Sequence, residues 1–210
     1  MNYIAITTFN QSGLDSYGEK FINSYIENFP DEIPLYVYLE KCSLNINSDK
    51  IKLFDHDEDL PKLTAFKEKY KDDLRANGEC PNPNRRDKHK SFKWNAIRFA
   101  NKVYAIFDAA NRAQTDTIIW VDADMIVHTK LTMKNFQKLV PENIALSYLG
   151  RGKKWPECGF YSLNLNFPEI KEFLNLFEWY YEDAEHGIFT LEEWHDSYVF
   201  WKVLQQIQNK

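Results

Sequence analysis

Apolar residues occur in short runs separated by polar or turn-forming segments, and their spacing predicts most of the secondary structure. Residues 2–7, 35–39 and 51–54 are short β-rich runs. Between the first two, apolar side chains recur at helical spacing from Leu14 to Pro30, which predicts an amphipathic helix. A strand, a helix and a strand in this order form a βαβ unit, so we expect parallel strands.

The same patterns continue through the second half of the chain. Residues 61–74 and 92–110 have helical spacing, and 118–121 is the kind of continuous apolar run that is buried on both faces of a sheet. Beyond it we expect a helix at 132–139 capped by Thr132, strands at 144–149 and 158–165, a helix capped by Asn166, and a last helix with a capping box of Thr190 and Glu193. The predicted fold class is α/β, with a mixed, mostly parallel sheet flanked by helices.

Composition narrows the class of protein. The 210 residues suffice for one domain, and a hydrophobic share of 44% supports a sizeable core. A net charge of -5 argues against nucleic-acid binding by electrostatics. No run is long enough for a membrane span, and Met1 leads directly into a strand rather than a signal peptide. Three widely spaced cysteines favour a reducing interior, so we expect a cytoplasmic protein.

The strongest chemical signal follows the apolar run at 118–121. Asp122 and Asp124 stand one residue apart at the end of a strand that we expect to be buried. Two such carboxylates repel one another and lose solvation, and a divalent cation removes both costs. Hard oxygen ligands suit Mg²⁺ or Mn²⁺. An ordinary Asp-rich turn, with Asp122 capping a backbone amide, is the alternative.

Basic and polar residues near the same sheet edge are candidates for binding a phosphorylated ligand. Ligands of α/β sheets gather at the carboxyl ends of strands, so Thr7, Thr8 and Asn10 are candidates there, although they are equally consistent with a turn. Arg98 and Lys102 share a helix face, and a diphosphate between them would offset their repulsion. A basic group at 85–90 is a further candidate to close over a diphosphate, or else a solvated charge cluster. The acidic segment 55–59 reads as a solvated loop.

Two later segments carry candidates for binding a sugar. Trp155 and Glu157 stand in the loop at 150–160, where the ring offers a stacking surface and the acid a partner for a hydroxyl; packing is the alternative for the ring. Asp196 heads the apolar stripe of the last helix, which is an unusual place for a carboxylate. A buried structural ion pair, for example with the basic loop, is its alternative role.

These motifs resemble a known family. Asp122-Ala123-Asp124 after a hydrophobic strand is similar to the Asp-x-Asp signature of GT-A glycosyltransferases. Trp194-His195-Asp196 resembles the Trp-His-Asp element of the retaining α-galactosyl and blood-group glycosyltransferases. The resemblance implies a GT-A (Rossmann-like) fold, Mn²⁺ or Mg²⁺ held by Asp122 and Asp124, and transfer of a sugar from a nucleotide-sugar donor, with a UDP-sugar favoured, to a hydroxyl of a glycan or other acceptor.

The resemblance also suggests residue roles and a division of the chain. Thr7, Thr8, Asn10, Arg98, Lys102 and Asp122 would bind the donor; Trp155, Trp194 and His195 would meet the acceptor; Asp196 and Glu157 would be catalytic. Residues 1–210 would form a single domain, with nucleotide binding in about 1–130 and acceptor binding in about 131–210. The sequence is short for that family and shows no membrane-anchoring stem, so we expect a soluble enzyme of bacterial or viral type.

One departure from the family leaves the stereochemistry open. Ser197 follows Asp196 directly, where the family has a glutamate proposed as its catalytic carboxylate. Retention and inversion therefore remain alternatives. A haloacid-dehalogenase-like phosphatase, with Asp122 as nucleophile, and a catalytically silent sugar-binding domain are the rival functions.

Overall fold

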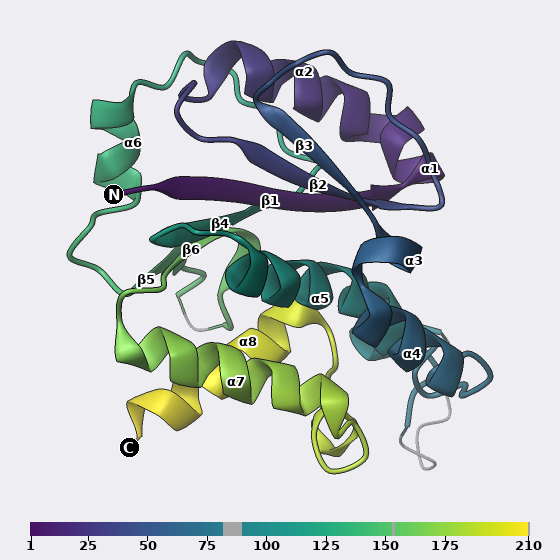
Figure 1. Ribbon diagram of the computed structural model, residues 1–210. Coiled ribbons are helices and arrows are strands. Elements are labelled where there is room, and N and C mark those ends of the chain that lie inside the picture. The colour runs from purple at the N-terminus through teal and green to yellow at the C-terminus, as the bar shows by residue number, and fades with distance from the viewer. Residues whose placement is uncertain (82–89, 153, 210) are drawn as a thin grey trace.

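The computed structural model describes residues 1–81, 90–152 and 154–209 of the chain (Figure 1). It has a six-stranded mixed sheet in the order β3-β2-β1-β4-β6-β5. The strands are β1 (Tyr3–Asn10), β2 (Leu35–Glu40), β3 (Ile51–Asp55), β4 (Thr117–Val121), β5 (Leu146–Leu149) and β6 (Glu157–Asn164). The first four are parallel to one another, whereas β6 is antiparallel to β4 and to β5. The predicted α/β class with a mostly parallel, mixed sheet is confirmed.

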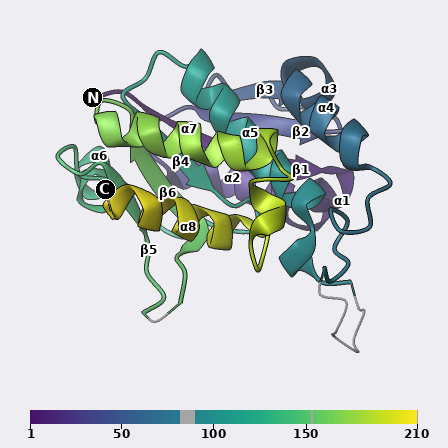
Figure 2. The same ribbon diagram turned by 90° about the horizontal axis from the view of Figure 1, so that it is seen from below.

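Helices cover both faces of the sheet (Figures 1 and 2). One face carries α1 (Gln11–Gly13), a π-helical turn (Leu14–Gly18), α2 (Glu19–Asn28) and α6 (Met133–Leu139). The other carries α3 (His56–Asp59), α4 (Pro61–Tyr70), α5 (Ala96–Arg112), α7 (Pro168–Glu182) and α8 (Asp196–Gln208); short 3₁₀ turns lie at Phe92–Trp94 and Ile188–Thr190. Two apolar clusters, one on each face, form the core, and β4 contributes alternate residues to both. Within the described residues, no helix is long and apolar enough to cross a bilayer.

Several boundaries differ from the sequence prediction for reasons of local hydrogen bonding. β1 continues to Asn10, beyond the predicted strand at 2–7, because Thr8, Phe9 and Asn10 pair with β2, so Thr8 does not lie in a turn. The acidic segment at 55–59 is not a solvated loop. Asp55 caps α3 by accepting from the amides of Asp57 and Glu58.

Two predicted helix caps are also wrong. Asn166 does not cap α7, because its side chain donates to Asp116 and Phe167 takes the N-cap position. Thr190 donates its hydroxyl to the carbonyl of Gly187 instead of forming a capping box, and α8 begins after His195, whose ring accepts from the Tyr198 amide. The predicted Thr132 cap of α6 is confirmed.

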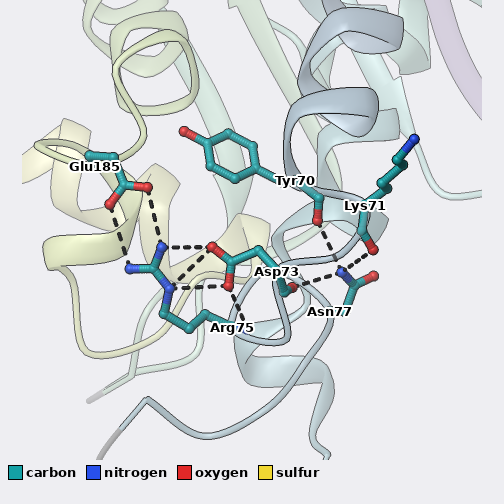
Figure 3. Close-up of polar contacts among 6 residues, drawn as sticks. All are labelled: Tyr70, Lys71, Asp73, Arg75, Asn77 and Glu185. Atoms are coloured by element: carbon teal, nitrogen blue, oxygen red, sulfur yellow. Dashed lines mark hydrogen bonds and ion pairs between the residues drawn. The ribbon is translucent and has the colours of Figure 1, made fainter.

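The chain after α4 is held by a polar network rather than left as a solvated loop (Figure 3). The guanidinium of Arg75 pairs with Asp73 at 2.6 Å and with Glu185 at 3.2 Å, and this tethers the turn to the segment after α7. The side-chain amide of Asn77 donates to the carbonyls of Tyr70, Lys71 and Asp73. Residues 85–89 of the predicted basic loop lie outside the described residues. The backbone of Lys90 forms an isolated antiparallel β-bridge with that of Glu79.

Candidate functional site

A cleft of about 670 Å³ opens at the carboxyl edge of the parallel strands. β1 and β4 are neighbours at the centre of the sheet. The chain after β1 leads to β2 on one side of this pair and the chain after β4 leads to β5 and β6 on the other side, and α/β sheets form ligand crevices where the strand order reverses in this way. Asn10 ends β1, Glu40 ends β2, and Asp122 follows β4, so three polar side chains reach the cleft from successive strand ends. Glu157 reaches it from the start of the antiparallel β6.

Lys102 connects two acidic residues of the cleft. Its ammonium lies 3.1 Å from Asp122 Oδ1 and 2.6 Å from Asp196 Oδ2, and it donates to the carbonyl of Cys158 at 2.5 Å. Burial alone would lower the pKa of Lys102, but the two carboxylates outweigh it and raise the pKa above its ordinary value. The ring of Trp120 lies beneath the ammonium at 4.7 Å. Three partners occupy the three donor positions of the lysine, so in this arrangement it contacts no ligand directly.

Asp122 and Asp124 differ sharply in their surroundings. Asp122 Oδ1 accepts from the indole of Trp120 at 2.5 Å as well as from Lys102, and the side chain is 36% exposed. Asp124 is exposed, and both residues line the cleft. Asp122 is therefore fixed through one oxygen, while Asp124 is accessible to a ligand. The sequence-based alternative of Asp122 as a capping residue does not account for these contacts with Lys102 and Trp120.

Asp196 reaches the cleft because α8 begins at this residue. His195 caps the helix, and this places the carboxylate at the N-terminus, where the backbone amides favour negative charge. Its side chain is only 12% exposed, and its ion pair with Lys102 compensates the cost of burial. The buried ion pair considered from the sequence is present, but the partner is Lys102 and not the basic loop.

The three candidates at the end of β1 have different positions. Thr7 is fully buried, its hydroxyl has no hydrogen-bond partner among the described residues, and it does not line the cleft. Thr8 lines the cleft, with its hydroxyl shared between the Tyr38 carbonyl and the ring of His56. Asn10 also lines the cleft, and its side chain accepts from the Gly13 amide. Of the three, Thr8 and Asn10 are placed to meet a ligand.

The Thr8–His56 contact predicts an acid-sensitive fold. Thr8 donates to the Tyr38 carbonyl, so its oxygen accepts from His56 Nε2–H, and the buried Nδ1 then has no partner among the described residues. Burial, reinforced by Lys67, lowers the pKa of His56 from 6.5 to about 4, while Glu40, Asp55 and Asp57 oppose the shift. Above pH 6.5 the lowered pKa of His56 does not change the free energy of unfolding, because the ring is neutral in both the folded and the unfolded chain. As the pH falls from 6.5 to 4, only the unfolded chain gains this proton. We expect this to remove about 3 kcal/mol of stability.

Urea unfolding of the wild type and of His56→Gln between pH 7 and about pH 4 measures this contribution. The wild type should lose about 3 kcal/mol more than the variant over that interval, because both share all other titrations. Equal losses in the two proteins would contradict the assignment.

The residues considered for sugar contacts occupy two regions. Glu157 lines the cleft and pairs with Arg151, and Arg98 lines the same cleft. Trp155 is half-buried and packs its ring on His195 at 5.4 Å and on Tyr198 at 5.6 Å. The packing alternative for Trp155 is therefore observed, with part of the ring still exposed.

Trp194 and His195 belong to the interior. Trp194 is completely buried, donates its indole N–H to the Leu191 carbonyl and packs on Phe189, so direct contact with an acceptor is excluded in this structure. His195 is 4% exposed, bonds Glu193 at 2.9 Å and packs on Phe92 and Phe99. Burial lowers its pKa. Both residues support the start of α8 instead of forming a wall of the cleft.

Sequence reasoning missed Glu40, Asn95 and Asn101, which line the same cleft. Glu40 accepts from Lys67 at 2.5 Å and from the Asn101 amide at 3.1 Å. Its position at the end of β2 is the signal that would have found it, because the same rule selected Asn10 at the end of β1. Asn95 caps α5 through the Arg98 amide, a local motif that carries no sign of a ligand site.

This chain is similar to known proteins in structure but not in sequence. No family model matches the sequence, and no curated protein does. Among solved structures, the fold is similar to the crystal structure of the glycosyltransferase GlyE in Streptococcus pneumoniae TIGR4, with a TM-score of 0.49 and 10% sequence identity. The match covers 99% of this chain and 43% of that chain, so the chain spans less than half the length of GlyE. A similarity this remote carries no argument about function, which must come from the site.

Proposed function

We propose that the chain is a metal-dependent GT-A-type glycosyltransferase, which transfers a sugar from a nucleoside-diphosphate donor to a hydroxyl acceptor. The observation that carries the proposal is the meeting of Asp122, Lys102 and Asp196 in one cleft from three separate elements. Asp122 and Asp196, which belong to two separate family motifs in the sequence, are joined here by one lysine. A UDP-sugar is the favoured donor, on the resemblance of those motifs.

The donor set at Asp122 and Asp124 fits Mg²⁺ or Mn²⁺. Within residues 1–81, 90–152 and 154–209, no three His, Cys, Asp or Glu side chains cluster as a closed metal site. Two carboxylates on an open cleft suit a cation that takes its other ligands from phosphate oxygens and water. When bound, such a cation neutralises negative charge on a diphosphate leaving group.

The side chains of the chain itself supply positioning and charge. Lys102 holds Asp122 and Asp196 in fixed directions, so neither carboxylate must reorganise when a ligand enters. Arg98 and Asn10 lie on the wall where the donor would bind, and the donor part of the chain would be about 1–130. Asp196 and Glu157 offer carboxylate oxygens to the sugar or to the acceptor hydroxyl. A carboxylate that attacks the reacting carbon and is then displaced by the acceptor would give retention, whereas a carboxylate that only takes the proton of the attacking acceptor hydroxyl would give inversion.

Thermal unfolding with nucleotide sugars, with and without Mn²⁺, tests the proposal. At a ligand concentration about 100 times the Kd, the added stability is about 2.7 kcal/mol, which raises the Tm by about 5–10 °C. Asp124→Ala should abolish the Mn²⁺-dependent part of the shift, because it removes an exposed cleft carboxylate without touching the core.

Asp72→Ala, at an exposed acid after α4, is the control and should keep the full shift. A shift that survives in Asp124→Ala would contradict the metal assignment. Hydrolysis of a phosphate monoester that depends on Asp122 would favour the phosphatase, and donor binding without transfer or donor hydrolysis would favour a silent sugar-binding domain.

A further inference from the structure

A second hollow, distinct from the candidate active site, lies beside α6 and β5. It is an apolar groove of about 620 Å³ formed by the segment after β4, by α6 and by the strands β5 and β6. α6 and β5 lie on the same side of the molecule in both views (Figures 1 and 2). Three large apolar side chains of the groove are unusually exposed: Ile126 at 47%, Leu139 at 56% and Leu149 at 44%. Exposed apolar side chains gathered around one hollow, rather than scattered singly, indicate a contact surface.

The charged side chains that line this groove are basic, and the nearby carboxylate of Glu142 accepts from Gln137 of α6. Among the described residues that line it, none is acidic, whereas Lys138 and His128 are present. Lys134 lies one helical turn before Lys138 on the same face of α6, and both are exposed. The sequence from Met125 to Leu139 contains three lysines and no acid, in a chain whose net charge is -5. Positive charge is therefore concentrated beside the exposed apolar residues.

We propose that this groove, with Lys134 and Lys138 at its border, docks the protein on an anionic lipid surface. Apolar side chains that insert at the lipid interface, next to lysines that meet anionic headgroups, are the combination by which a protein without a spanning helix binds a membrane. The same surface of a second copy would cover Ile126, Leu139 and Leu149, but it would bring Lys134 and Lys138 of the two copies towards one another. The charge complementarity favours the anionic surface.

The groove and the cleft approach each other at Gly159. A Cβ at this glycine would lie 3.5 Å from Asp122 Oδ2 in the cleft and 3.9 Å from Met125 Sδ in the groove. A docked molecule would therefore hold its cleft close to the lipid surface. Under the proposed function, docking would bring the cleft to an acceptor that is carried by a lipid. Docking itself does not depend on the proposed function.

Co-sedimentation with vesicles tests docking on the full chain. Vesicles of phosphatidylcholine alone are compared with vesicles containing about one-third phosphatidylglycerol. Binding should occur to the anionic vesicles, and Lys134→Gln with Lys138→Gln should weaken it about tenfold or more. Ile126→Ser with Leu139→Ser should weaken binding as well, since it removes the inserted apolar area.

Matched controls separate docking from general charge and folding effects. Lys20→Gln with Lys171→Gln changes two exposed lysines on α2 and α7, and Leu74→Ser changes an apolar residue that is 58% exposed elsewhere. These variants should bind like the wild type, and the thermal unfolding of every variant is measured beside it. Equal binding to both vesicle types, unchanged binding by the Lys134/Lys138 variant, or a stable dimer lost with Ile126→Ser and Leu139→Ser would each overturn the proposal. Loss of vesicle binding with donor binding intact would leave the proposed function untouched.

Discussion

Replacement of Lys102 by methionine is expected to lower the free energy of unfolding by about 3–5 kcal/mol. Methionine fills similar space but removes the ammonium that pairs with Asp122 and Asp196. Asp196 is only 12% exposed, so its carboxylate would remain buried without a counter-charge, and the Cys158 carbonyl would lose its donor. Urea unfolding at neutral pH measures the loss.

A double-mutant cycle shows whether the loss comes from the charge pair. Adding Asp196→Asn to Lys102→Met removes the uncompensated charge, so the double variant should be more stable than Lys102→Met alone. Lys20→Met, at an exposed position on α2, is the control and should change stability by less than about 0.5 kcal/mol. Strictly additive losses would mean that Lys102 and Asp196 do not stabilise one another, and the site would lose its central element.

Asp196→Asn is expected to lower turnover by about 10²–10⁴-fold while nucleotide-sugar binding persists. The amide keeps the size of the side chain and can still lie beside Lys102, but it offers neither a negative charge nor a proton acceptor of carboxylate strength. The donor side of the cleft, with Asp122, Asp124 and Asn10, is unchanged. Measured transfer or donor hydrolysis should therefore fall while the Mn²⁺-dependent thermal shift remains.

Glu157→Gln is the informative comparison, because Glu157 lines the same cleft and is the other carboxylate that we propose to be catalytic. A larger loss of turnover with Glu157→Gln than with Asp196→Asn would make Glu157, and not Asp196, the main catalytic carboxylate. Asp183→Asn, in an exposed pair with His186, is the control for a general effect of removing an acid and should retain full turnover. Unchanged turnover in Asp196→Asn would remove that residue from the mechanism.

The parts of the fold that follow from local pattern were predictable. The apolar run of β4 is buried throughout, as its composition required, and its position between β1 and β6 explains why. The Thr132 cap was also predictable, since it depends on contacts within four residues. The caps assigned to Asn166 and Thr190 were wrong because other partners, Asp116 and Gly187, compete for the same side chains. Such competition is not visible in the residue type alone.

The candidate site likewise has features that could be predicted from the sequence and features that could not. Two acids at the end of a buried strand and a third at the head of the last helix were predictable, because strand burial and helix periodicity follow from residue order. The contacts of Lys102 with Asp122 and Asp196, the entry of Glu40 into the cleft and the burial of Trp194 were not predictable in this way. The two Lys102 contacts span 20 and 94 positions of the chain, and their distances are set by the packing of α5 and α8 on one face of the sheet.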